Sequence, residues 1–198
     1  MSLLLESIKL LDGQFQNLFH HEQRINYSLK VLCGVTEEFN LERFLDRVDR
    51  PMKGLFKCRL SYDDLSKDLE FIPYVPKVVS TLRAIENDRI SYDFKYLDRR
   101  AIDRMFEARK GCDDILIIKE GLVTDSSYAN VVFRKGRDWF TPWSPLLKGT
   151  MRAFLLERDL IQKEEIRVED IATYDAFKLI NAMLEFESPE QQISNIIF

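Results

Sequence analysis

Residues 123–133 read Val-Thr-Asp-Ser-Ser-Tyr-Ala-Asn-Val-Val-Phe, so the acid Asp125 and a run of small polar residues lead directly into an apolar strand pattern. Taken alone, this pattern favours a capped turn in which Asp and Ser side chains bond to nearby backbone groups. A short apolar strand at 115–118 precedes it, and Glu120-Gly121 is typical of a turn. We therefore expect strands joined by tight turns in this part of the chain.

Strand and helix patterns alternate on both sides of this stretch. Residues with β-branched and aromatic side chains predict strands at 5–11, 55–62, 71–75, 78–85, 131–133 and 139–140, a short edge strand at 166–168, and a last apolar stretch at 176–183. Apolar spacing and capping residues predict one helix that ends at Gly34, one that begins after Asn40, and helices over 97–110 and 150–158. This alternation predicts an α/β or α+β fold.

The length of 198 residues fits one domain or two small ones. The stretch bounded by prolines near Pro76 marks the expected domain boundary, which divides the chain into domains 1–77 and 78–198. Residues 188–198 resemble a tail or a short arm.

The composition narrows the classes of partner. A formal net charge of −4 disfavours non-specific binding to nucleic acid, which depends on neutralising phosphates. Cys33, Cys58 and Cys112 form neither a disulfide framework nor a zinc or redox pair. No apolar run is long enough to cross a bilayer, and the first residues lack the basic region of a signal peptide. We therefore expect a cytoplasmic protein with no metal, nucleic-acid or membrane partner.

Lys95 is the first candidate for chemistry. It lies among aromatic residues in the segment Ser-Tyr-Asp-Phe-Lys-Tyr, residues 91–96, at an expected strand-to-helix junction. Burial beside aromatic rings can desolvate a lysine and make its amine nucleophilic. The ordinary alternative is a solvated surface charge, and the local sequence alone favours that alternative.

Gly149 is the second candidate, because it opens the helix expected at 150–158. At such a helix start the backbone N–H groups of Thr150 and Met151 can face an anion, which the helix dipole also favours. A glycine before a helix is common, however, and the segment 146–152 matches no Walker A pattern.

Taken together and in this order, these features resemble the class IV aminotransferase family, the fold type IV pyridoxal-phosphate (PLP) enzymes, and most closely its aminodeoxychorismate lyase branch. The motifs that carry the resemblance span nearly the whole chain and are Leu5-Glu6-Ser7-Ile8-Lys9, His21-Glu22-Gln23-Arg24, Lys95-Tyr96-Leu97-Asp98-Arg99, Asp125 through Phe133, Thr141-Pro142, Gly149-Thr150-Met151-Arg152 and Asn181-Ala182-Met183. The resemblance implies a D-amino acid aminotransferase-like fold of two small α/β domains with the cofactor at their interface.

The resemblance also implies a role for each matched residue. Lys95 would carry PLP as a Schiff base and move protons at the substrate Cα. Asp125 would keep the pyridine nitrogen protonated. The groups expected around the cofactor phosphate are Arg24, Asn181 and the backbone of Gly149, Thr150 and Met151.

Ordinary structural roles remain open for several of these residues. Arg24 on an amphipathic helix could be a solvated charge, and His21 could brace it or be structural. Asn181 could satisfy buried backbone groups. Asp125 is one methylene shorter than the acid usual in the family, so its backbone must approach more closely or its contact with the pyridine nitrogen is weaker. The chain also begins inside the first long strand of the family, so the cofactor site is better supported than any substrate site.

We therefore expect a PLP-dependent enzyme that acts on an amino acid or another small amino or keto substrate, either as an aminotransferase or as an aminodeoxychorismate lyase-like enzyme. The alternative is a trimmed relative that binds PLP, or no cofactor, and acts through protein contacts. An unrelated α/β phosphate-binding domain is the third interpretation. Because fold type IV proteins usually dimerise, the resemblance also implies a homodimer.

Overall fold

The computed structural model describes residues 3–184 and 186–198, and the chain divides into two compact units. Unit 1 comprises Met1–Pro76 and Phe94–Asp98, and unit 2 comprises Lys77–Asp93 and Arg99–Phe198. The first division lies one residue before the expected boundary at 77. The short segment Phe94–Asp98, which that boundary assigns to the second domain, belongs to unit 1.

Unit 1 contains one antiparallel sheet with the strand order β2-β1-β3-β4. Its strands are β1 (Leu4–Leu11), β2 (Gln14–Phe15), β3 (Leu55–Tyr62) and β4 (Lys67–Pro73). The hairpin predicted at Asp12-Gly13 is confirmed, with φ values of 46° and 78° that Asp and Gly tolerate in a tight turn. Strand β4 begins at Lys67 rather than at residue 71. The apolar pattern misses its first residues, because exposed acids alternate there with half-buried residues.

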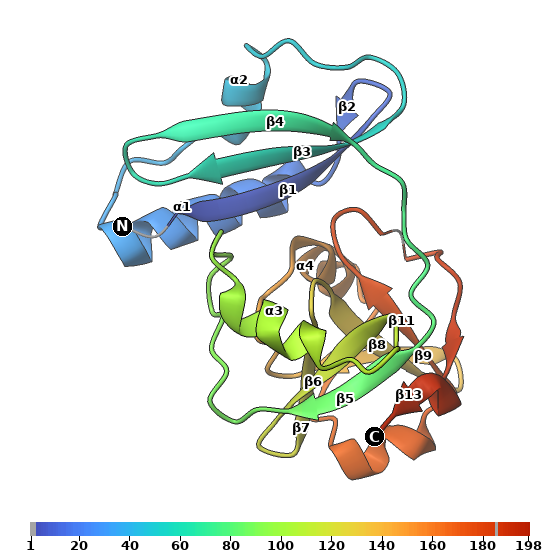
Figure 1. Ribbon diagram of the computed structural model, residues 1–198. Coiled ribbons are helices and arrows are strands. Elements are labelled where there is room, and N and C mark those ends of the chain that lie inside the picture. The colour runs from blue at the N-terminus through green and yellow to red at the C-terminus, as the bar shows by residue number, and fades with distance from the viewer. Residues whose placement is uncertain (1–2, 185) are drawn as a thin grey trace. The chain divides into compact units, whose positions relative to one another are not determined.

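Helix α1 (Leu18–Cys33) lies along this sheet and turns Ile25 and Leu29 into a core shared with Ile8 (Figure 1). It ends, as predicted, at Gly34, whose φ of 70° is the left-handed conformation that stops a helix. Helix α2 (Leu41–Leu45) begins after Asn40, whose side chain accepts a hydrogen bond of 2.7 Å from the Arg43 N–H. That helix is shorter than its apolar stripe suggests, because the N–H groups of Arg47 and Val48 bond three residues back instead of four.

The segment Phe94–Asp98 is extended and runs antiparallel to the start of β1. The Leu5 N–H donates to the Lys95 carbonyl at 2.9 Å, and the Leu97 N–H donates to the Leu3 carbonyl at 2.8 Å. Helix α3 (Arg100–Glu107) starts five residues after Lys95. The helix expected from about residue 97 therefore starts later, at Arg100, and hydrogen bonds to a strand 90 residues away hold the extended backbone at Lys95.

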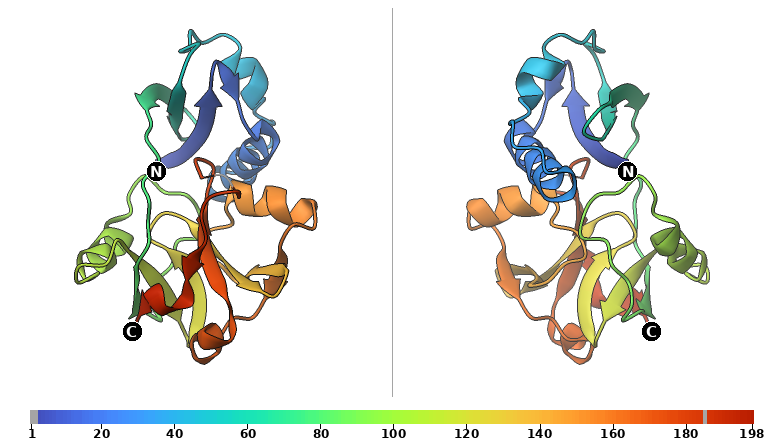
Figure 2. Two further views of the ribbon diagram at one scale, coloured as in Figure 1. Left: turned by 90° about the vertical axis from the view of Figure 1, so that its right-hand side faces the viewer. Right: turned by 90° about the vertical axis from the view of Figure 1, so that its left-hand side faces the viewer.

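Unit 2 is built on a mixed sheet with the order β10-β9-β8-β7-β6-β5-β13, in which β11 also pairs with β8, and β12 with β11. Its strands are β5 (Leu82–Glu86), β6 (Asp114–Lys119), β7 (Leu122–Ser126), β8 (Asn130–Lys135), β9 (Asp138–Pro142), β10 (Gln162–Glu164), β11 (Ala176–Ile180), β12 (Gln191–Gln192) and β13 (Ile196–Ile197). Helices α3 and α4 (Thr150–Glu157) lie on opposite sides of these strands (Figure 2). The mixed α/β class expected from the alternating patterns is confirmed.

Near the end of the chain, residues 166–168 pair at the edge of β7 as predicted, through an antiparallel bridge between Arg167 and Leu122, and Val168–Thr173 is a 3₁₀ helix. The sequence pattern does not predict the further edge strand Gln162–Glu164. A polar strand at a sheet edge carries no apolar periodicity, so the sequence pattern misses it. Residues 188–198 are not a tail, because β12 pairs with β11 and β13 pairs in parallel with β5.

Candidate functional site

In unit 1, three charged or titratable side chains meet beneath the sheet. Glu6 on β1 is fully buried and is hydrogen-bonded by two side chains from one face of α1, His21 and Arg24. Its Oε1 accepts from the Arg24 Nε at 2.8 Å, and its Oε2 accepts from the Arg24 Nη2 and lies 2.6 Å from the His21 Nδ1. The two bonds from Arg24 form a bidentate pair, which fixes the plane of the guanidinium group.

The electrostatics of this cluster follow from burial combined with pairing. Burial alone would raise the pKa of Glu6, but the charges and hydrogen bonds of Arg24 and His21 outweigh it and lower the pKa to about 2. Burial lowers the pKa of His21, and the positive charges of Arg24 and Lys95 lower it further against the opposing effect of Glu6. Glu6 is therefore ionised, and a neutral His21 donates its Nδ1 proton to it.

The predicted phosphate ligand Arg24 is thus oriented by Glu6, and its side chain keeps 13% of its surface exposed. The expected contact between His21 and Arg24 is indirect, because both residues bind the same carboxylate. Glu6 was not among the predicted site residues. The available signal is its position on β1: Glu6 lies two residues from both Leu4 and Ile8, so it shares their core-facing side of the strand although it is charged.

Lys95 also belongs to unit 1 and is half-buried. Its neighbour Phe94 stacks on Tyr27 with the ring centroids 5.9 Å apart, and it meets Tyr96 edge-on at 6.0 Å. The aromatic setting expected from the sequence is therefore present. The electrostatic effect of Lys95 on His21 places its charge near the Glu6 cluster.

In unit 2, Asp125 is the centre of a second cluster. It lies near the end of β7, is 5% exposed, and pairs across the sheet with Asn130 at the start of β8. Its Oδ1 accepts from the Asn130 Nδ2 at 2.7 Å, and its Oδ2 accepts from the Leu147 N–H at 2.9 Å. The chain between Asp125 and Asn130 makes a tight turn, in which the Ser126 Oγ accepts from the Ala129 N–H at 3.1 Å.

The Asp125 carboxyl has neutral hydrogen-bond donors but no ion pair within residues 3–184 and 186–198. Burial raises its pKa to about 6, although the N–H groups of Leu147 and Asn130 and the more distant charge of Arg152 oppose the rise. Arg152 is itself buried and bonds elsewhere, with its Nη2 donating to the Pro142 carbonyl at 2.8 Å. Such a carboxylate is suited to accept a cation or a proton donor from a ligand.

Gly149 directly precedes α4, as predicted, and has no side chain to cap the first turn of the helix. Thr150 is buried and Met151 is half-buried at that turn. The first N–H groups of a helix have no partner within the helix, so this end offers donors to an anion. The helix start and Asp125 are linked through Leu147, which stands two residues before Gly149.

Asn181 follows β11, and its carboxamide is already engaged with the backbone. Its Oδ1 accepts from the Met183 N–H at 2.8 Å and from the Leu184 N–H at 3.0 Å, and its Nδ2 lies 3.5 Å from the Tyr128 carbonyl. Of the two roles considered for Asn181, the structure displays the satisfaction of backbone groups. The contact with a phosphate stays a prediction.

The predicted site residues therefore form two groups, each described within its own unit. Unit 1 holds Arg24 and Lys95, to which the structure adds Glu6 and His21. Unit 2 holds Asp125, Asn181 and the helix start that comprises Gly149, Thr150 and Met151, to which it adds Asn130.

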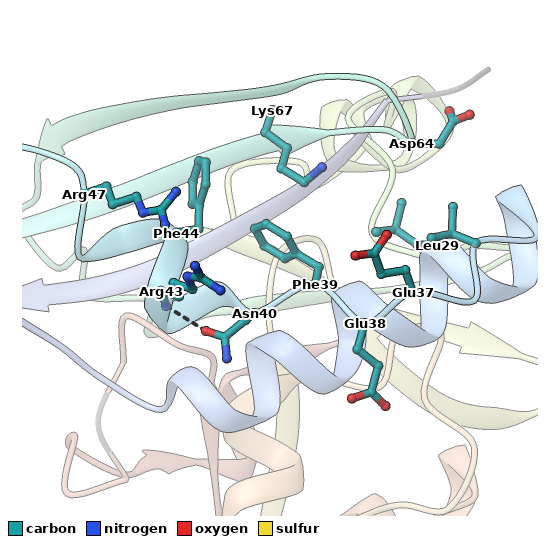
Figure 3. Close-up of a pocket in the computed structure, with 11 residues that line it drawn as sticks. Leu29, Glu37, Glu38, Phe39, Asn40, Arg43, Phe44, Arg47, Asp64 and Lys67 are labelled. Atoms are coloured by element: carbon teal, nitrogen blue, oxygen red, sulfur yellow. Dashed lines mark hydrogen bonds between the residues drawn. The ribbon is translucent and has the colours of Figure 1, made fainter.

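A separate hollow of about 470 Å³ lies in unit 1 beside the end of α1, α2 and β4, with Phe39 and Phe44 at its middle (Figure 3). The charged residues that line it are three bases and three acids, namely Arg43, Arg47, Lys67, Glu37, Glu38 and Asp64. None of the predicted site residues lines it. Its balanced charges favour no single class of ligand.

In the part of the chain that the structure describes, no three His, Cys, Asp or Glu side chains are grouped so that they could hold a metal ion. No described helix combines the length and the apolar character needed to cross a membrane.

Comparison with known proteins shows the family of this chain. The model of the family described as amino-transferase class IV matches residues 60–187. An uncharacterized protein of Haemophilus influenzae is 37% identical over 182 residues, which is 91% of this chain and 97% of that protein.

Solved structures extend the comparison. A Haemophilus somnus protein, provisionally named a 4-amino-4-deoxychorismate lyase, is 36% identical with a TM-score of 0.87, covering 92% of this chain and 97% of that one. A Mesorhizobium loti protein, provisionally named an amino-acid aminotransferase, covers all of both chains with a TM-score of 0.82 at 19% identity. A hypothetical aminotransferase from Mycobacterium tuberculosis with bound PLP has a TM-score of 0.75 at 19% identity, covering 92% of this chain and 78% of that one. At 19% identity the last two similarities concern the fold.

Proposed function

This chain belongs to the class IV aminotransferase family, and we propose that it is a PLP-dependent enzyme that acts on a small amino-containing substrate. The reaction is a transamination or an aminodeoxychorismate lyase-like elimination. Both provisional names among the similar structures fall within this proposal, and the lyase name belongs to the relative at 36% identity. By the same family resemblance we propose that the protein works as a homodimer on an amino or keto substrate.

The observation that carries the proposal is the setting of Asp125. This carboxylate is buried, accepts hydrogen bonds on both oxygens and forms no ion pair with the described residues. PLP, when bound, supplies an electron sink that is strongest while its pyridine nitrogen is protonated. The remaining acceptor capacity of Asp125 suits it to hold a proton on that nitrogen, and its low-dielectric surroundings strengthen the interaction.

The other predicted residues have matching tasks. Lys95 would hold the cofactor through its amine and would exchange a proton with the substrate Cα. Arg24, held flat by Glu6, would bind phosphate oxygens through its guanidinium group. The backbone N–H groups at the start of α4, with Asn181, complete the phosphate ligands.

The decisive experiment tests the lysine directly. The purified protein is expected to be yellow, and borohydride reduction should fix the cofactor on a peptide that contains Lys95. Lys95→Arg should abolish that labelling, whereas the control Lys178→Arg should retain it, since Lys178 is a buried lysine whose Nζ donates to the Phe186 carbonyl. A wild-type protein that stays colourless after addition of PLP would refute the proposal.

Turnover separates the two kinds of PLP protein considered above. The yellow protein is assayed with amino acids paired with keto acids, and with aminodeoxychorismate. Product formation that Lys95→Arg abolishes supports the enzyme. A yellow protein without turnover on any of these substrates would instead support a relative that binds PLP and acts through protein contacts.

A further inference from the structure

Asn130 makes an unusual set of contacts for a residue outside the predicted site. It is 5% exposed, and its Nδ2 donates to the Asp125 Oδ1 at 2.7 Å and to the Leu147 carbonyl at 2.8 Å. The Leu147 N–H donates in turn to the other oxygen of Asp125. The Asn130 carboxamide and the Leu147 N–H therefore each bind one oxygen of the Asp125 carboxylate.

Gly149 adds an independent observation. Its backbone, with φ −69° and ψ 147°, is extended and open to any residue, so backbone conformation does not explain the glycine. A Cβ atom built on Gly149 would lie 2.0 Å from the Asn130 Oδ1 and 3.1 Å from its Cγ. Only a residue without a Cβ leaves room for the Asn130 carboxamide in this position.

We infer that Asn130 is a positioning residue, which ties the Asp125 carboxylate to the loop before α4, and that residue 149 is glycine in order to admit it. This inference rests on the proposed function and deepens it. Asn130 links the group expected at the pyridine nitrogen to the backbone expected at the phosphate. The spacing between these two ends of the site is thereby set by one side chain.

The physical consequence of losing Asn130 follows from burial. Without its amide, the Asp125 Oδ1 and the Leu147 carbonyl each lose a donor in a place that water reaches poorly. The carboxylate form of Asp125 then has fewer donors to stabilise its charge, so its pKa rises further. The loop before α4 also loses the attachment to Asp125 that runs through Asn130.

The experiment is a double-mutant cycle on the holoenzyme with Asn130→Ala, Gly149→Ala and the double variant, in which PLP affinity is measured by absorbance titration. Each single variant should weaken PLP binding about tenfold or more, as expected for a lost hydrogen bond to a charged group. If Gly149→Ala acts by displacing Asn130, it should add less than about twofold in the Asn130→Ala background. The inference would be overturned if the losses of PLP affinity in the two single variants multiply in the double variant. It would also be overturned if Asn130→Ala binds PLP like the wild type.

A pH measurement distinguishes positioning from general stability. The acid limb of PLP binding should move to higher pH in Asn130→Ala, which removes the donor to the Asp125 Oδ1. Asn26→Ala is the control, because Asn26 bridges the Phe39 N–H and carbonyl with its carboxamide and touches no predicted site residue. It should lower the melting temperature and leave the pH profile unchanged. An unshifted acid limb in Asn130→Ala would contradict the inference.

A third measurement does not depend on PLP. Carbon-13 NMR of the Asp125 carboxyl, titrated in the protein without added cofactor, should show a higher pKa in Asn130→Ala than in the wild type. If the wild type binds no PLP, the proposed function fails while this titration still decides the role of Asn130. An identical Asp125 titration in both proteins would show that Asn130 does not hold the acid.

Discussion

Glu6 in unit 1 and Asp125 in unit 2 are both buried carboxyl groups, yet their pKa values shift in opposite directions. Burial pushes both upward, but Glu6 falls to about 2 whereas Asp125 rises to about 6. Glu6 has Arg24 and His21 as partners, while Asp125 is held by the amide of Asn130 and a backbone N–H.

The difference shows what each acid is built to do. A carboxylate paired with a cation inside the protein is saturated, and it orients its partner. A carboxylate held by neutral donors keeps its charge uncompensated and retains affinity for a cation from outside. The first arrangement suits the support of Arg24, and the second suits direct contact with a protonated ring nitrogen. Three predictions test this comparison.

The largest effect is expected where the internal ion pair is broken. Glu6→Gln should destabilise the fold by about 3–5 kcal/mol, because it leaves the Arg24 charge without its partner in a largely buried setting. Urea unfolding measures this change. The control Glu70→Gln removes a partly exposed pair with Arg59 on the same sheet and should cost under about 1 kcal/mol. Equal effects of the two substitutions would show that the Glu6 pair is not special.

The second prediction contrasts the pH dependence of the two acids. The folded pKa of Asp125, about 6, exceeds its ordinary value of 3.8, so the folded state binds the proton more tightly and stability declines as pH rises through this interval. Asp125→Asn removes this decline, which is on the order of 3 kcal/mol. Glu6 behaves oppositely: its contribution is complete above its ordinary pKa of 4.5 and is lost as pH falls toward 2.

Unfolding of the wild type and Asp125→Asn, followed by circular dichroism between pH 4 and 7, measures the Asp125 effect. The stability difference should grow in favour of the variant as pH rises. A constant difference across that range would mean that Asp125 titrates at its ordinary pKa.

The third and smallest effect concerns cofactor affinity. Asp125→Asn keeps the shape of the side chain but removes its charge, so PLP should bind roughly 10–100-fold more weakly, as expected for the loss of a charged hydrogen-bond partner. The absorbance of bound PLP should also report an unprotonated ring nitrogen. Unchanged affinity and spectrum in Asp125→Asn would remove Asp125 from the site and leave the comparison with Glu6 purely structural.

Local signals were enough to predict the elements that carry parts of the site. The Asp12-Gly13 turn, the Asn40 cap and the helix start after Gly149 depend on residues close together in the chain, and all three are confirmed. The family motif at 125–133 also predicts Asp125 as a site residue.

The features that the sequence did not reveal depend on distant residues. The pairing of Glu6 with Arg24 joins positions 18 residues apart, and Asn130 reaches Leu147 across 17 residues. Such contacts follow from how strands and helices pack, which spacing along one segment does not encode. The backbone partner of Lys95 was not predicted for the same reason, since the Lys95 carbonyl accepts from the distant Leu5 N–H.

The discontinuous course of unit 1 has a consequence for how this protein can be cut, fused or recombined. The chain passes from one unit to the other three times, after Pro76, after Asp93 and after Asp98. A fragment that stops at Pro76 would lose the segment that pairs with Leu3 and Leu5, and with it Lys95. An exchange of domains between homologues therefore needs more than one breakpoint, and a single crossover near Pro76 would combine the lysine segment of one parent with the Glu6 strand of the other.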